Sequence, residues 1–364
     1  MRELLVGDKV LDHQMSDDVG SIEAIPWPNG PPPRRLLAIR MQAMGDVAIT
    51  LPYICAVQRL LPDTLIDFVT LGQNRDLPRA LRILRHVDGL GGGRRERWQL
   101  LMAPLLLARL LTRRYDVVLD LQNNRVSRTI RRAVAPRAWA SFDRYSPLSA
   151  GERTRRTIAA AGFSLPRVEA ALPVRDPSAG LAILQSAGWD RSSELVILSP
   201  AGAFPSRNWP LERYAEFATR WQRGRTAQFA VLGLANLHRK AGSLKAILGS
   251  RLLDLAGRTS PSEALSIVQR ASLVLTEDCG LMHLAWISGV PTLALFGSSQ
   301  HVWSTPLGQH TACLHSGDLA CGGCMDRTCR YGDVHCLTRY TADYVVERAL
   351  ALVERSSRLA TKII

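Results

Sequence analysis

The sequence predicts an α/β protein of two domains. The chain has 364 residues, short apolar runs alternate with helical periods from Leu36 onward, and a stretch rich in proline and charge at residues 162–191 interrupts the alternation. A chain of this length exceeds one ordinary core, and alternating strands and helices are typical of parallel sheets. We therefore expect one domain over residues 34–175 and a second over residues 176–338.

The first 33 residues are polar, lack a sustained period and end in PWPNGPPP. Such a composition favours extended backbone, so we expect a flexible, poorly packed tail without catalytic residues.

The first domain reads as strands and helices in alternation. The predicted strands are 36–40, 65–71 and 117–121, and the predicted helices are about 47–60, 76–86 and 98–114. The segment Glu96 to Tyr115 is apolar in its middle and basic at its end, which fits either an interfacial membrane helix or a crossover helix packed on the sheet. Its position between two strands favours the crossover helix.

The second domain repeats the alternation. Its predicted strands are 195–199, 227–233, 252–255, 273–276 and a strand ending at Phe296, and its predicted helices are 211–223, 237–248, 260–270 and 281–288. An amphipathic helix at 340–355 follows, within the final segment 339–364.

Gly45 and Asp46 lie between the first predicted strand and its helix. A glycine there permits a tight turn, which would place the Asp46 carboxylate in the crevice where open α/β sheets bind ligands. On this stretch alone, a helix-capping role for Asp46 explains the residue better than a chemical one. Asp120, Gln122 and Asn123 follow another predicted strand and either line the same crevice or form a solvated strand end.

The stretch from Thr276 to Ser298 is a strand end, an acidic turn, a helix and a strand. The free N–H groups at that helix start suit a diphosphate. Asp278 either caps the helix or accepts hydrogen bonds from a sugar hydroxyl. His283 lies inside the helix, where a packing role is the default and donation to a phosphate is the alternative.

Lysine and arginine outnumber aspartate and glutamate by 46 to 32, for a net charge of +14. Such a charge attracts anionic partners. The basic residues do not form a nucleic-acid recognition pattern, so a membrane surface or a phosphorylated glycolipid ranks above nucleic acid. Because no apolar run is long enough to span a membrane and the first 20 residues are too polar for a signal peptide, we expect a cytoplasmic protein.

Four of the seven cysteines follow the spacing C-x2-C-x4-C-x6-C, at Cys321, Cys324, Cys329 and Cys336. In the cytoplasm these are free thiols or metal ligands rather than disulfides. Four thiolates suit tetrahedral zinc or iron, although the last two spacings match no standard zinc finger.

Three motifs resemble glycosyltransferase family nine, the ADP-heptose:lipopolysaccharide heptosyltransferases, and the resemblance extends over about residues 34–355. They are IRMQAMGDVAITLP, SPAGAFPSRNWPLERYAEF and EDCGLMHLAWISGVPTLALFGS. Their order and spacing fit two Rossmann-like domains.

The resemblance implies a GT-B fold, in which two Rossmann-like domains face a central cleft and the last helix returns to the N-terminal domain. It implies an inverting transfer without a required cofactor, from ADP-heptose to an anionic glycolipid, at the inner face of the cytoplasmic membrane. By position the base is Asp46, and the acceptor side includes Gly45, Asp120, Gln122 and Asn123. The donor side comprises Ser199, Gly202, Arg207, Asn236, Asp278, Cys279, Gly280, Leu281, Met282 and His283.

The sequence departs from the family pattern at several donor-side positions, one of which is the SPAG at Ser199–Gly202 in place of the more common His-Pro-Gly. Arg207 stands where lysine is usual, and Glu277 adds a negative charge beside Asp278. A carboxylate facing the diphosphate would repel it, so Glu277 has to point elsewhere. Two alternatives stay open: an enzyme of this fold with another nucleotide-sugar or a protein or capsular acceptor, and a non-catalytic nucleotide-sugar-binding protein.

Overall fold

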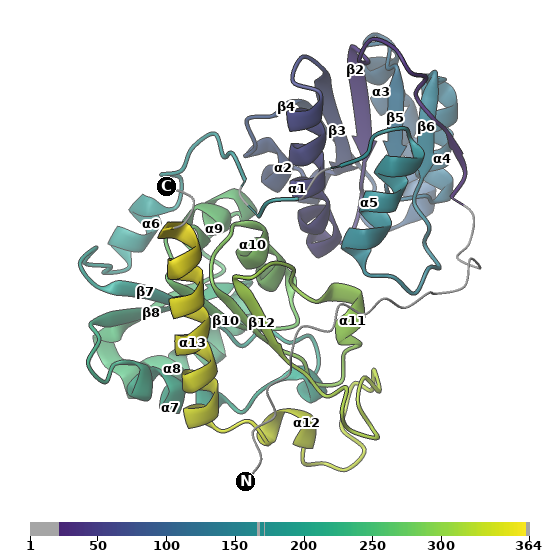
Figure 1. Cartoon of the computed structure of the whole chain (residues 1–364). Helices are drawn as coiled ribbons and strands as arrows, with labels where there is room; N and C mark the ends of the chain where they lie inside the picture. Colours follow the sequence, from purple (N-terminus) through teal and green to yellow (C-terminus); the bar gives the residue numbers. More distant parts are fainter. Residues whose placement is uncertain (1–21, 166–167, 171, 362–364) are drawn as a thin grey trace.

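The computed structural model describes residues 22–165, 168–170 and 172–361. The chain forms two α/β domains, each around one six-stranded sheet (Figure 1). The first 21 residues lie outside the described part, so the expected tail is tested only from Ile22 to Pro33. Among the described helices, none combines the length and apolar character needed to cross a membrane.

The N-terminal sheet has the strand order β1-β6-β5-β2-β3-β4, in which only the β1–β6 pair is antiparallel. Its strands are β1 (Ala24–Ile25), β2 (Arg35–Ile39), β3 (Leu65–Leu71), β4 (Leu84–Leu90), β5 (Val117–Asp120) and β6 (Ala138–Ser141). The tail prediction is therefore wrong at residues 24–25, where β1 adds an edge strand beside β6.

Helices cover both faces of this sheet. Leu36 and Ala38 of β2 pack towards α1 (Met44–Leu60), α2 (Asp76–Arg79) and α5 (Ala150–Ala160). Leu37 and Ile39 pack towards α3 (Glu96–Leu111) and α4 (Arg125–Val134) on the other face. The strand is buried on both sides because its side chains alternate between two covered faces.

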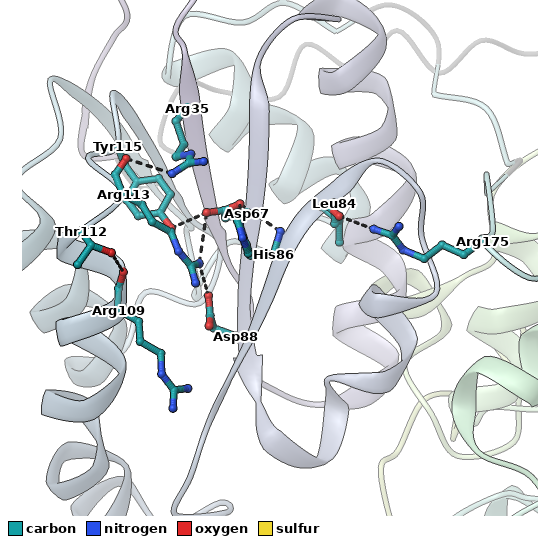
Figure 2. Close-up of polar contacts among 10 residues, drawn as sticks. All are labelled: Arg35, Asp67, Leu84, His86, Asp88, Arg109, Thr112, Arg113, Tyr115 and Arg175. Carbon is teal, nitrogen blue, oxygen red and sulfur yellow. Dashed lines mark hydrogen bonds and ion pairs between the residues drawn. The ribbon is translucent and has the colours of Figure 1, made fainter.

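A buried polar network ties the end of α3 to the sheet (Figure 2). The Asp67 carboxylate on β3 is fully buried and accepts a 2.7 Å hydrogen bond from the Tyr115 hydroxyl. Arg113, just after α3, donates to Asp67 and to Asp88 on β4, and the backbone N–H of His86 also donates to Asp67. Because buried charges need such partners, this network holds α3 firmly against β3 and β4.

The C-terminal sheet is fully parallel, with the order β12-β11-β10-β7-β8-β9. Its strands are β7 (Glu194–Ser199), β8 (Ala227–Gly233), β9 (Leu252–Ala256), β10 (Leu273–Glu277), β11 (Thr292–Leu295) and β12 (Thr311–Leu314). This is the strand order of the Rossmann fold. The strands are added outward from β7 in one direction and then from β10 in the other, so the strand order reverses between β7 and β10.

Alternate residues of β7 face two helical layers. Val196 and Leu198 pack towards α7 (Leu211–Trp221), α8 (His238–Leu248) and α13 (Ala342–Thr361). Leu195 and Ile197 pack towards α6 (Leu181–Ser186), α9 (Pro261–Val268) and α10 (Gly280–Ile287). The short helices α11 (His301–Ser304) and α12 (His335–Thr338) lie in the loops after β11 and β12.

The two domains share one of their hydrophobic clusters. A single buried cluster includes residues from α1 and β2 of the N-terminal domain and from α9, α10 and β7 of the C-terminal domain. Helix α1 packs on α10 and α2 packs on α9. The N-terminal ends of α1 and α10, one from each domain, therefore lie against one another.

Several sequence predictions need correction. The expected helix over 76–86 ends at Arg79, and the missed strand β4 begins at Leu84. The sequence analysis also missed α4, β6, α5 and β12. The last helix does not follow the expected return to the N-terminal domain: α13 packs on α7 and on β10 and β11 (Figure 1).

Candidate active site

The candidate residues cluster at the points where strand order reverses in each sheet. In the N-terminal sheet the reversal lies between β2 and β5, which are followed by Asp46 and Gln122. In the C-terminal sheet it lies between β7 and β10, which are followed by Arg207 and Asp278. Open α/β sheets bind ligands at the carboxyl ends of such strands.

Asp46 occupies the first turn of α1 and has two partners. One carboxylate oxygen accepts a 2.8 Å hydrogen bond from the backbone N–H of Ala43, the residue before the helix. The other lies 3.0 Å from the guanidinium of Arg40, and 37% of the side chain stays exposed. Asp46 therefore caps the helix, as one sequence interpretation held, and still presents its carboxylate to solvent.

Gly45 does not form the tight turn that we expected, because α1 already begins at Met44. The glycine is needed for space. A β-carbon at position 45 would lie 2.7 Å from Cδ2 of His283, a residue of α10 in the other domain. A β-carbon on Gly280, the first residue of α10, would likewise lie 2.8 Å from the methyl carbon of Met44.

A cavity of about 580 Å³ opens beside Asp46. Its lining residues are Arg40, Gln42, Ala43, Asp46, Arg94, Gln122, Phe142, Arg144 and Arg153. Four arginines around one carboxylate suit an anionic ligand. The sequence analysis missed all four, since Arg94, Arg144 and Arg153 come from three separate segments and meet only in the fold. Arg40 could have been found from the sequence, because it lies within the motif IRMQAMGDVAITLP that also contains Asp46.

The acceptor-side candidates separate into two groups. Gln122 lines the cavity, and its amide oxygen accepts hydrogen bonds from the backbone N–H groups of Met41 and Gln42. Asp120 is fully buried and accepts from the N–H groups of Gln122 and Asn123, so it is not a solvated strand end. Asn123 donates to the carbonyl of Phe142. Asp120 and Asn123 thus shape the loop after β5 without lining the cavity.

Arg207 and Asp278, two of the predicted donor-side residues, form an ion pair. The Arg207 guanidinium lies 3.3 Å from the Asp278 carboxylate, and both side chains are mostly buried. The guanidinium also lies over the ring of Phe204 at 5.1 Å. Asp278 accepts a second hydrogen bond, from the Ser304 hydroxyl. The carboxylate therefore pairs with an arginine and does not cap α10, whose N-cap residue is Cys279 without a capping side chain.

Glu277 points away from Asp278 into the domain. It accepts hydrogen bonds from the N–H groups of Gly202 and Trp209 and from the Tyr214 hydroxyl. Burial raises the pKa of Glu277 to about 7. The carboxylate thus anchors the loop that carries Arg207 and does not face the donor side. Gly202 has to be glycine, because a β-carbon would lie 2.4 Å from the carbonyl oxygen of Arg207.

Most of the other donor-side candidates surround the start of α10. The Ser199 hydroxyl, at the end of β7, lies 3.5 Å from the thiol of Cys279. Gly280, Leu281 and Met282 form the first turn, in which no acidic side chain occupies the helix end. Asn236 lies exposed in the turn after β8.

His283 has a defined protonation state. The indole N–H of Trp286 donates to Nδ1 of His283 at 3.2 Å, and an indole nitrogen can only donate. Nδ1 is therefore unprotonated, and the neutral imidazole carries its proton on Nε2. Burial lowers the pKa of His283, while the charges of Asp278 and Asp46 act in the opposite direction. His283 thus lies within electrostatic reach of both carboxylates.

The four cysteines of the predicted cluster line one small pocket, together with Asp333 and His335. Burial and the neighbouring thiols raise the pKa of Cys336 to about 11. As the described side chains lie, no group of three His, Cys, Asp or Glu residues could hold a metal ion.

Comparison with known proteins identifies the family. The family model described as "Glycosyltransferase family 9 (heptosyltransferase)" matches residues 152–335, half of the chain. The chain belongs to glycosyltransferase family 9. Its resemblance to that family is thereby confirmed, and the protein is a glycosyltransferase.

Relatives in family 9 cover most of the chain. Lipopolysaccharide heptosyltransferase 1 of Pseudomonas aeruginosa is 27% identical over 321 residues, which cover 82% of this chain and 88% of the relative. The structure of the Escherichia coli ADP-heptose lipopolysaccharide heptosyltransferase II aligns with a TM-score of 0.66 at 19% identity, covering 89% of this chain and 99% of that one.

A more distant structural relative contains iron. The iron-containing dodecameric glycosyltransferase TibC of enterotoxigenic E. coli aligns with a TM-score of 0.53 at 13% identity, covering 89% of this chain and 77% of that one. These likenesses confirm the GT-B fold.

Proposed function

We propose that this family 9 enzyme transfers heptose from ADP-heptose to the inner core of lipopolysaccharide, with inversion at the anomeric carbon. The names of its relatives supply the donor and acceptor. The observation that carries the proposal is the position of His283 at the contact of α1 with α10, next to Gly45 and within electrostatic reach of both Asp46 and Asp278. This contact links the arginine-lined cavity of one domain to the Arg207–Asp278 pair of the other.

Asp46 is the proposed general base. Its carboxylate removes the proton of the acceptor hydroxyl while that oxygen attacks the anomeric carbon of the heptose. The bond to the diphosphate breaks on the opposite face of the sugar, and ADP leaves. Ala43 and Arg40 hold the carboxylate in one orientation, which favours a near-attack geometry.

Arg207 and the start of α10 stabilise the departing diphosphate in this proposal. Negative charge grows on the diphosphate in the transition state, and a guanidinium with free backbone N–H groups is the matching donor set. Asp278 holds Arg207 in place, and donor binding would shift part of that pairing to phosphate oxygens. His283, whose buried ring borders Gly45 across the contact between α1 and α10, carries its proton on Nε2 in the same region. No step in this scheme requires a metal ion.

The arginines of the cavity supply the acceptor specificity. Arg94, Arg144 and Arg153 surround the proposed base, and an inner-core acceptor carries phosphate and carboxylate groups. Such groups bind arginine in bidentate geometry. The acceptor is anchored in the cytoplasmic membrane, so the enzyme works there as a peripheral protein.

The test compares wild type with Asp46→Asn, using ADP-heptose and a truncated lipopolysaccharide acceptor. Asparagine retains the cap to Ala43 but cannot accept the proton, so turnover falls by at least about a hundredfold while donor affinity stays nearly unchanged. Unchanged turnover would refute the role of Asp46. An absence of heptose transfer by wild type, with transfer from another nucleotide-sugar, would refute the donor.

The cysteine cluster receives a separate proposal. We infer that Cys321, Cys324, Cys329 and Cys336 bind a structural zinc or iron ion as thiolates. Support comes from the donor type, from their shared pocket and from the iron-containing structural relative TibC. The thiols have to move closer to one another on binding, because no three of them converge in the described structure.

Metal analysis of protein purified under reducing conditions tests this inference. We expect about one zinc or iron per chain, lost in Cys336→Ser. Cys313→Ser is the matched control, since Cys313 lies outside the pocket lining. A metal content near zero in the wild type would leave the four cysteines as plain thiols.

A further inference from the structure

Helix α3 presents an apolar face that no described part of the protein covers. Trp98, Leu101 and Leu105 are 52%, 60% and 68% exposed, and Pro104 and Ala108 are exposed beside them. The positions 101, 104, 105 and 108 follow the i, i+3, i+4, i+7 pattern of one helix face. A contiguous exposed apolar face on a folded domain marks an interaction surface.

Loose packing does not explain this exposure. The opposite face of α3 buries Gln99, Ala103, Leu106 and Leu110 in the core under the sheet. The carboxyl end of the helix is fixed by the network around Asp67, from which the Arg109 side chain points away (Figure 2). The helix therefore has one face packed on the sheet and one apolar face directed outward.

Positive charge surrounds the outward face. Helix α4 packs beside α3 on the same side of the sheet (Figure 1). The exposed arginines of this region are Arg94, Arg95, Arg97, Arg109, Arg114, Arg125, Arg128 and Arg132. Glu96 is the single acidic residue within α3, and α4 has none. An apolar stripe bordered by arginines is the pattern by which helices lie on anionic bilayers.

The surface is continuous with the reaction site. Arg94, two residues before α3, lines the cavity that contains Asp46. A bilayer in contact with α3 would therefore lie next to the opening of the proposed acceptor pocket. This face is also opposite α1, so a docked bilayer would not meet the α1–α10 contact between the domains.

We propose that the outward faces of α3 and α4 dock the enzyme on an anionic phospholipid bilayer. Leu101, Leu105 and Trp98 enter the headgroup boundary, and the arginines of α4 bind the lipid phosphates. The inference rests on the proposed function in one respect: it explains how an acceptor anchored in that bilayer reaches Asp46.

Vesicle co-sedimentation of the full chain tests the docking face. We expect wild type to bind vesicles of phosphatidylethanolamine with phosphatidylglycerol and not to bind vesicles of phosphatidylcholine. Leu101→Gln with Leu105→Gln should weaken binding about tenfold or more. Arg128→Gln with Arg132→Gln should weaken it about fivefold for each arginine. Thermal unfolding confirms that these surface variants fold.

Ile247→Gln on α8 is the matched control, since Ile247 is also exposed but belongs to the other domain. It should bind vesicles as wild type does. The inference is overturned if wild type does not bind anionic vesicles, if it binds neutral vesicles equally well, or if the α3 and α4 variants bind unchanged.

Heptose transfer to an acceptor oligosaccharide freed of lipid separates this inference from the proposed function. The α3 and α4 variants should retain that transfer, because they do not line the cavity. A wild type that binds anionic vesicles as expected but transfers nothing refutes the proposed function and leaves the docking face intact. If the α3 and α4 variants bind anionic vesicles as wild type does while wild type transfers heptose as expected, the docking face is refuted and the proposed function is left intact.

Discussion

The guanidinium of Arg40 lies 3.0 Å from the Asp46 carboxylate and also donates to the backbone carbonyl of Leu121. Arg40 directly follows β2, and Leu121 directly follows β5. One side chain thus links both strands of the reversal point to the proposed base. Arg40 is a positioning residue in this arrangement, since it acts on the reaction through Asp46.

Replacement of Arg40 by leucine should lower kcat about tenfold to a hundredfold, because the carboxylate loses one of its two fixed partners. The KM for the donor should change little. Arg40→Lys should recover part of the rate, because lysine retains a charge that can reach Asp46. Steady-state kinetics of both variants give the measurement, and equal rates in leucine and lysine variants would contradict the positioning role.

Arg207→Ala should weaken ADP affinity about tenfold to a hundredfold, the range for loss of a charged hydrogen bond. Arg207→Lys should bind ADP more nearly as wild type does, because the charge is kept. Titration calorimetry with ADP measures both. If affinity holds in Arg207→Ala while the rate falls, the guanidinium acts only on the departing diphosphate.

Gly45→Ala and Gly280→Ala form a matched pair at the contact between the domains. The alanine at 45 meets the ring of His283, which is buried and held by Trp286, so we expect a loss of about 1–3 kcal/mol in stability and lower transfer. The alanine at 280 meets only the flexible end of Met44 and should be tolerated. Thermal unfolding and transfer rates check the pair, and equal behaviour of the two variants would contradict the explanation.

Glu277 should make stability fall as pH rises. Its pKa is raised by burial from 4.5 to about 7, so the folded state keeps a proton that the unfolded state loses. The contribution is fully present below pH 4.5 and is lost by pH 7, a difference of about 3 kcal/mol. Denaturant unfolding at several pH values should show this slope in wild type and not in Glu277→Gln. A common slope would mean that Glu277 is ionised in both states.

Local patterns predicted most of the strands and, of the residues that line the cavity, Asp46 and Gln122. Strands such as Leu65–Leu71 and Ala227–Gly233 match their predicted bounds, because they are short apolar runs between turn residues. Strand β4 was missed because its sequence, LRHVDGL, mixes polar and apolar residues at an edge of the sheet. The helix expected over residues 76–86 was too long, because α2 ends at Arg79.

The site residues that the sequence analysis missed are those joined only by tertiary structure. Asp46 was found because its motif is local, whereas Arg94, Arg144 and Arg153 are far apart in the chain and meet around it. The sequence also could not show why position 45 has to be glycine, because the side chain that leaves no room there, His283, lies more than 200 positions later in the chain. Glu277 looked like a second charge beside Asp278, and only its three hydrogen bonds reveal an anchor.

The buried cluster that runs from α1 through α10 has a consequence for any attempt to divide the molecule. A cut near Arg175 would leave Val47 and Leu51 on one fragment and Leu281 and Trp286 on the other without their partners. Each fragment would then expose an apolar surface, and it would aggregate or need the other fragment to bury that surface. The two lobes therefore depend on one another for the burial of these side chains, even though each has a complete sheet of its own.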